Sequence, residues 1–171
     1  MPDQNGMPLN AQALRNRVDA SWRQLQRALD APAAALTAAA ADGWSVKDHL
    51  AHITAWEQAL LATLSGESWL DGLGLGDLAQ EPGDIDAINA LILARRQSQP
   101  LATVLAEARA THARVNEALA ALTDADLARS NSSFYPAAPE PMRDEPIVGW
   151  IVMNTFQHYD DHGQAFRALV G

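Results

Sequence analysis

Apolar residues recur every three or four positions along most of the chain, a spacing that places them on one face of a helix. The first such stripe consists of Leu14, Val18, Trp22, Leu25 and Leu29. Similar stripes predict four long helices, with a shorter one between the second and third. These helices are expected at residues 10–30, 45–65, 100–122 and 146–169, and the shorter one at 85–97. Because β-branched and aromatic residues are sparse and alanine is abundant, the pattern predicts an all-α fold.

Capping residues and breakers separate these helices. Ser45 followed by Asp48 has the form of a capping box, and Thr123 followed by Asp126 predicts a single turn. Glycine-rich residues 66–83 and proline-rich residues 128–145 are expected to form connections, the second long enough to shape the mouth of a pocket. Residues 33–41 are left open as a short helix or a loop.

The chain of 171 residues has the size of one domain. We expect residues 1–9 to be a disordered tail and residues 10–171 to form a single domain. Residues 1–9 lack the features of a signal peptide, and no run of 18 apolar residues occurs, so we expect a cytoplasmic protein without a membrane partner. A formal net charge of −9 disfavours binding to nucleic acid.

The strongest chemical signal is a pair of histidines near the C-terminus. His158 and His162 are spaced by four, so both imidazoles lie on one face of a helix and can reach one metal ion. A third ligand is needed, and His52 is the candidate. The sequence contains no cysteine, so thiolate ligands are excluded and three imidazoles would favour zinc or nickel. The alternative is that His158 and His162 are core histidines bonded to backbone or to Asp160 and Asp161, and that His52 is a hydrogen-bonded histidine between helices.

Other polar and aromatic residues have more than one interpretation. His49 is interpreted as a fourth ligand, as a group that contacts a ligand without binding the metal itself, or as a residue on the helix surface. Glu57 is a general base for a bound water or one half of a solvated salt bridge. Trp56 and Tyr159 either line a pocket or belong to the core, and Asn154 is a further candidate neighbour of the histidines. His112, on the third long helix, is interpreted as structural or surface-exposed.

Two segments resemble a known family. Residues 43–57 read GWSVKDHLAHITAWE, and residues 154–162 read NTFQHYDDH. These resemble the second-helix and last-helix signatures of the DinB/YfiT-like superfamily. Residues 85–90, followed by Arg95, Arg96, Pro100 and Leu101, make the chain most similar to the ClbS/DfsB group within it. The resemblance covers most of residues 10–170.

The resemblance implies a four-helix bundle with a long crossover and one or two short extra helices, often dimeric. It also implies a metal site of one histidine from the second helix and two from the last, which fall on His52, His158 and His162. Two classes of function remain open. One is a metal-dependent hydrolase or thiol S-transferase acting on a small molecule, in some relatives with a low-molecular-weight thiol. The other is a non-catalytic protein that sequesters a toxic small molecule, as in ClbS-like self-protection.

The acidic surface generates the first prediction. We expect no binding to duplex DNA at physiological salt, because phosphates and a chain with a net charge of −9 repel each other. Fluorescence anisotropy with a labelled random-sequence duplex measures this directly. A submicromolar affinity that weakens with added salt would contradict the prediction.

Overall fold

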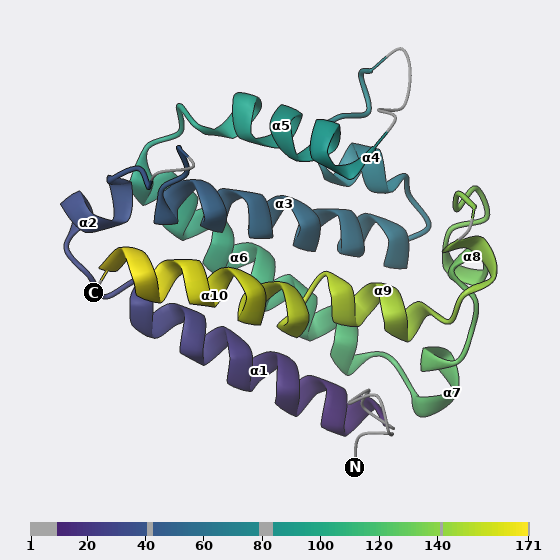
Figure 1. Ribbon diagram of the computed structural model, residues 1–171. Coiled ribbons are helices and arrows are strands. Elements are labelled where there is room, and N and C mark those ends of the chain that lie inside the picture. The colour runs from purple at the N-terminus through teal and green to yellow at the C-terminus, as the bar shows by residue number, and fades with distance from the viewer. Residues whose placement is uncertain (1–9, 41–42, 79–83, 141, 171) are drawn as a thin grey trace.

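The computed structural model describes residues 10–40, 43–78, 84–140 and 142–170 (Figure 1). Residues 1–9, the predicted tail, lie outside the described residues. The long helices are α1 (Ala11–Ala28), α3 (Val46–Leu64) and α6 (Leu101–Ala120), with α9 (Ile147–Met153) and α10 (Phe156–Val170) forming the last one. The shorter elements are α2 (Ala33–Thr37), α4 (Trp69–Gly72), α5 (Ile85–Arg96), α7 (Asp124–Leu127), α8 (Asn131–Phe134) and the 3-10 helix η1 (Met142–Asp144).

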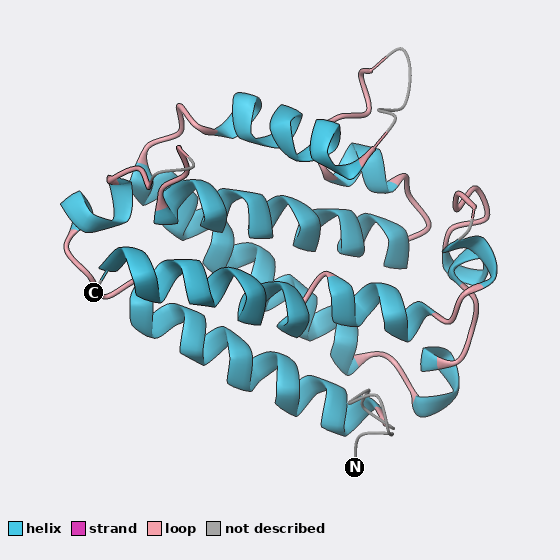
Figure 2. Cartoon of the chain, in the orientation of Figure 1, coloured by secondary structure: helices cyan, strands magenta, loops and turns pink. Residues whose placement is uncertain are grey.

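The long helices form a bundle of two parallel pairs that run in opposite directions. Helices α1 and α10 run the same way and pack together, while α3 and α6 run the opposite way and pack together (Figure 1). Because α3 and α6 are parallel, the chain must return between them, and α4 and α5 provide that crossover across α3. The described residues contain helices and loops but no strand (Figure 2). The predicted all-α fold is thus confirmed.

The start of α3 is fixed by the predicted capping box. The backbone N–H of Asp48 donates to the Ser45 hydroxyl at 3.2 Å, and the backbone N–H of Ser45 donates to the Asp48 carboxylate at 3.0 Å. Both groups would otherwise be unpaired at a helix N-terminus. The second predicted box, at Thr123 and Asp126, opens α7 in the same way.

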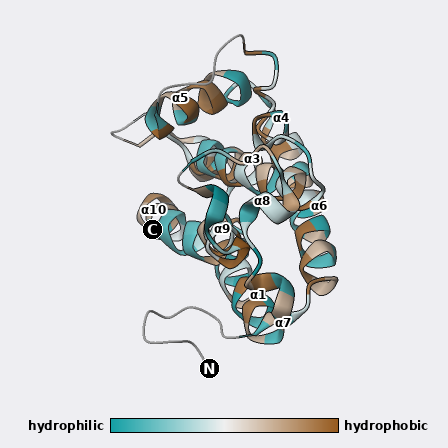
Figure 3. Ribbon diagram, turned by 90° about the vertical axis from the view of Figure 1, so that its right-hand side faces the viewer, coloured by the Kyte–Doolittle hydropathy of each residue, from teal (hydrophilic) through white to brown (hydrophobic). Residues whose placement is uncertain are grey.

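The core lies between the long helices, and each helix carries both hydrophobic and hydrophilic residues (Figure 3). The first predicted stripe is buried at four of its positions, while Leu29 is only partly buried. Helix α3 is the central element, because α2, α4, α5, α6 and α10 all pack against it. Nearly all its residues are therefore buried, polar ones included.

The last long helix differs from the prediction of one continuous element over residues 146–169. It is interrupted at Asn154 and Thr155, between α9 and α10. The Asn154 side-chain amide donates to the Trp150 carbonyl at 2.8 Å, and the Thr155 hydroxyl donates to the Ile151 carbonyl at 2.6 Å. Side chains that bond to carbonyls four residues back compete with the helical ladder and bend it. Apolar spacing does not report such an interruption, because the stripe continues across it.

The predicted connections contain short helices of their own. Residues 66–83 include α4, and residues 128–145 include α8 and η1. Of the open choice at residues 33–41, Ala33–Thr37 form the short helix α2, residues 38–40 are loop, and residue 41 lies outside the described residues. No helix in the described part of the chain is long and apolar enough to cross a membrane.

The close packing of α4 on α3 generates the second prediction. A methyl group at Gly72 would lie 2.6 Å from the Gln58 carbonyl oxygen and 2.7 Å from the Cα atom of Ala59, and these are backbone atoms of α3 that cannot easily move. We expect Gly72→Ala to lower the free energy of unfolding by about 1–3 kcal/mol, as overpacking does. Urea denaturation followed by circular dichroism measures the change.

Gly149 in α9 is the matched control, since a methyl group there would meet nothing within 4 Å. Gly149→Ala should leave stability unchanged or raise it by up to about 1 kcal/mol through helix propensity. Equal stability of the two variants would show that α4 does not pack on α3 as described.

Candidate metal centre

Helices α3 and α10 lie side by side and bring three histidines from distant parts of the sequence together (Figure 1). His52, His158 and His162 each offer one ring nitrogen, and these atoms lie within 4.8 Å of one another. The Nε2 atoms of His52 and His158 are 3.0 Å apart. The ring centroid of His162 is 4.9 Å from that of His52 and 4.7 Å from that of His158. The three candidates named from the sequence therefore form one cluster.

His49 joins this cluster through His162. It lies one helical turn before His52, and its Nδ1 atom is 2.9 Å from Nδ1 of His162. His49 is not one of the three histidines whose ligand atoms lie within 4.8 Å of one another. His49 is buried, so the interpretation of it as a surface residue is wrong.

The environment keeps these imidazoles neutral. Burial, and secondarily the neighbouring His162 and His49, lower the pKa of His52 to about 3. Burial also holds the pKa of His158 well below its usual value. Burial and the neighbouring His49 lower the pKa of His162 to about 4. Neutral imidazole is the form that binds transition metals, so these side chains are in the required state at neutral pH.

The donor set fits a borderline transition metal. Two Nε2 atoms 3.0 Å apart can share only one proton, so without a proton between them two lone pairs face each other. The Nδ1 atoms of His52 and His158 are buried and have no hydrogen-bond partner among the described residues. Imidazoles that are held close together, with buried ring nitrogens that the protein leaves without partners, are a suitable environment for an ion that accepts nitrogen ligands.

Aromatic side chains surround the histidines. The ring centroid of Trp44 lies 5.0 Å from that of His49 and 5.5 Å from that of His52. Trp56, a predicted pocket or core residue, lies 6.4 Å from His52 and donates its indole N–H to Asn89 at 3.2 Å. These rings exclude water from one side of the cluster, which strengthens polar interactions there.

Glu57 belongs to a different polar cluster. Its carboxylate is fully buried, accepts a hydrogen bond from Nδ1 of His112 at 3.0 Å, and also accepts one from the Tyr159 hydroxyl. A solvated salt bridge is therefore excluded. A general base must reach a water or a substrate proton, and the complete burial of the Glu57 carboxylate argues against that role. Burial raises the pKa of Glu57, and the bonds from His112 and Tyr159 oppose that rise.

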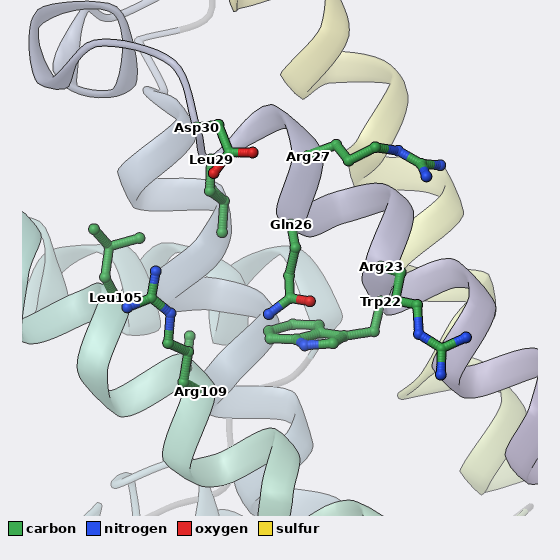
Figure 4. Close-up of a pocket in the computed structure, with 9 residues that line it drawn as sticks. Trp22, Arg23, Gln26, Arg27, Leu29, Asp30, Leu105 and Arg109 are labelled. Atoms are coloured by element: carbon green, nitrogen blue, oxygen red, sulfur yellow. The ribbon is translucent and has the colours of Figure 1, made fainter.

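The Glu57 cluster connects all the long helices of the bundle. Nε2 of His112 accepts from the Asn116 amide at 3.1 Å, so the remaining proton of a neutral His112 is on Nδ1, facing Glu57. The Trp22 ring of α1 stacks on His112 at 4.1 Å. Trp22 also lines a cleft of about 400 Å³ between α1 and α6, where Arg109 of α6 faces side chains of α1 (Figure 4). This cleft is separate from the histidine cluster.

Two further sequence candidates have local or structural roles. The Asn154 side chain donates to the Trp150 carbonyl, and this contact explains its burial without a role at the histidines. Tyr159 is buried in the core and faces Glu57. His112 has the structural role, but no local signal in the sequence indicates its pairing with Glu57, 55 residues away.

Comparison with known proteins agrees with this architecture. The family model of the DinB superfamily matches residues 17–165. Among solved structures, an uncharacterised protein from Escherichia coli UTI89 superposes with a TM-score of 0.69 over 95% of this chain and 94% of that chain. The two sequences are 15% identical, so this likeness shows the fold alone. No curated protein matches the chain.

The separation of the two clusters generates the third prediction. Tyr159→Phe removes a donor to the buried Glu57 carboxylate, so we expect the free energy of unfolding to fall by about 1–3 kcal/mol with helical content unchanged. Urea denaturation followed by circular dichroism provides the measurement. Tyr135→Phe, which removes the same atom from a partly exposed ring, is the control and should be close to wild type. A Tyr159→Phe protein as stable as this control would refute the role of the Glu57 bond.

Proposed function

The chain belongs to the DinB superfamily, and from this premise we propose that it binds a divalent transition metal, zinc or nickel, through His52, His158 and His162. We further propose that it is a metal-dependent hydrolase or thiol S-transferase acting on a small molecule. The observation that carries the proposal is the convergence of three ring nitrogens within 4.8 Å, from helices α3 and α10.

The protein residues prepare the site in two ways. The packing of α3 on α10 holds the imidazoles in place, so their side-chain freedom is restricted before any ligand arrives. Burial keeps His52 and His158 in the neutral state that binds metals. When bound, a zinc or nickel ion supplies Lewis acidity, which lowers the pKa of a water or a thiol and makes a nucleophile near neutral pH.

The site offers an approach for a small molecule. His158 and His162 are only partly buried, whereas His52 is 5% exposed. Solvent therefore reaches the cluster at the histidines of α10 rather than at the histidine of α3. A hydrolase would place water there, and a transferase would place a low-molecular-weight thiol. The resemblance of residues 85–101 to the ClbS/DfsB group supports a toxic small molecule as the second reactant.

A second candidate function is sequestration of a small molecule without catalysis. A cleft of about 470 Å³ beside α9 favours it. The lining includes the apolar residues Met142, Val148, Trp150, Val152 and Met153. Clefts of this size and character accommodate small apolar ligands. Retention of a metal would favour the enzyme, whereas a metal-free protein that binds an apolar fluorescent probe in this cleft would favour sequestration.

Metal content is the fourth prediction. Wild-type protein purified without an affinity tag and loaded with zinc or nickel should retain about one ion per chain by elemental analysis, because its site holds three imidazoles. His158→Ala and His162→Ala should each lose the ion while keeping the helical circular dichroism signal, since each removes one of three ligands.

Tyr135→Phe is the control for this experiment. It removes a hydroxyl from a partly exposed ring that belongs to neither the histidine cluster nor the Glu57 cluster, so the metal should be retained. A wild-type protein that retains no ion after loading would refute the proposed function. Retention of a full equivalent by both histidine variants would refute the ligand assignment.

A further inference from the structure

His49 lies beside the candidate ligands, and its contact with His162 restricts how that ring can be used. The two Nδ1 atoms are 2.9 Å apart, so one carries a proton and donates it to the other. If His49 donated, the proton of a neutral His162 would be on Nε2, and neither of its nitrogens would have a free lone pair. If His162 donates from Nδ1, its Nε2 lone pair is free to bind an ion.

We propose that His49 is a positioning residue for the metal site: it accepts the Nδ1–H of His162 and thereby directs Nε2 of His162 toward His52 and His158. This inference rests on the proposed metal site and adds a residue to it. Ligating histidines usually bond their second ring nitrogen to a protein group, which fixes the tautomer and the ring orientation.

His162 differs from the other candidate ligands in this respect. The Nδ1 atoms of His52 and His158 have no hydrogen-bond partner among the described residues, whereas Nδ1 of His162 is bonded to His49. The His162 side chain is also more exposed than that of His52, so packing restricts the orientation of its ring less. A hydrogen bond from outside the ligand set therefore has the largest effect on this ring.

The surroundings of His49 make it a fixed acceptor. Its ring is buried, and its centroid lies 5.0 Å from that of Trp44 and 6.2 Å from that of Phe166. It occupies the first turns of α3, whose start is fixed by the capping box of Ser45 and Asp48. A direct role as fourth ligand is disfavoured, because the three-histidine cluster does not include His49.

The test compares two substitutions of His49 in untagged full-length protein. His49→Leu removes the acceptor, while His49→Asn places an amide oxygen near the position of Nδ1 and keeps it. We expect His49→Leu to weaken zinc binding by roughly 10–100-fold, as loss of such an outer contact does, and His49→Asn to stay close to wild type. Competition with a chromophoric chelator measures the affinity, and circular dichroism checks folding.

X-ray absorption on the zinc-loaded proteins counts the imidazole ligands. We expect three in the wild type and in both variants. Four imidazoles in the wild type, with one lost in each variant, would overturn the proposal by making His49 a ligand. Wild-type affinity in His49→Leu would overturn it as well.

Nitrogen NMR of the metal-free protein distinguishes failure of this inference from failure of the proposed function. Long-range proton–nitrogen correlations should show His162 protonated at Nδ1, and protonation at Nε2 would overturn the proposal without reference to any metal. A wild-type protein that binds neither zinc nor nickel refutes the proposed function, and with it the positioning role of His49.

Discussion

The buried Glu57 carboxylate constrains how the whole bundle can pack. It can be enclosed only if donors from other helices reach it, and His112 of α6 and Tyr159 of α10 do so. Trp22 of α1 stacks on the ring of His112. Each long helix therefore contributes one side chain to this cluster. A rotation of α3, α6 or α10 would break a hydrogen bond to the buried Glu57 carboxylate, and breaking a buried polar pair of this kind costs several kcal/mol.

The same constraint sets the geometry of the histidine cluster. On α10, Tyr159 and His158 are adjacent and so point about 100° apart. On α3, Glu57 and His52 are five residues apart and also point in different directions. Once the bond between Glu57 and Tyr159 fixes the rotation of both helices, His52 and His158 face each other on another side of the contact. The polar core thus positions the candidate site without being part of it.

This division explains what the sequence could and could not predict. The helix stripes, the capping box at Ser45 and the spacing of His158 and His162 are local signals, and they located the helices and the cluster. The pairing of Glu57 with His112 joins positions 55 residues apart and has no local signature. The interruption at Asn154 and Thr155 was equally hidden, because side-chain bonds to carbonyls leave the apolar period unchanged.

The two clusters show opposite ways of burying histidine. His112 has an acidic acceptor for one nitrogen and an amide donor for the other, so its burial is compatible with stability. In the part of the chain described, the cluster of His52, His158 and His162 contains no carboxylate, and imidazole faces imidazole. The fold therefore provides hydrogen-bond partners for both ring nitrogens of His112. It nevertheless brings together His52, His158 and His162, among which Nδ1 of His52 and Nδ1 of His158 have no partner among the described residues. Local violations of polar pairing of this kind are expected where a site is kept for a ligand rather than for stability.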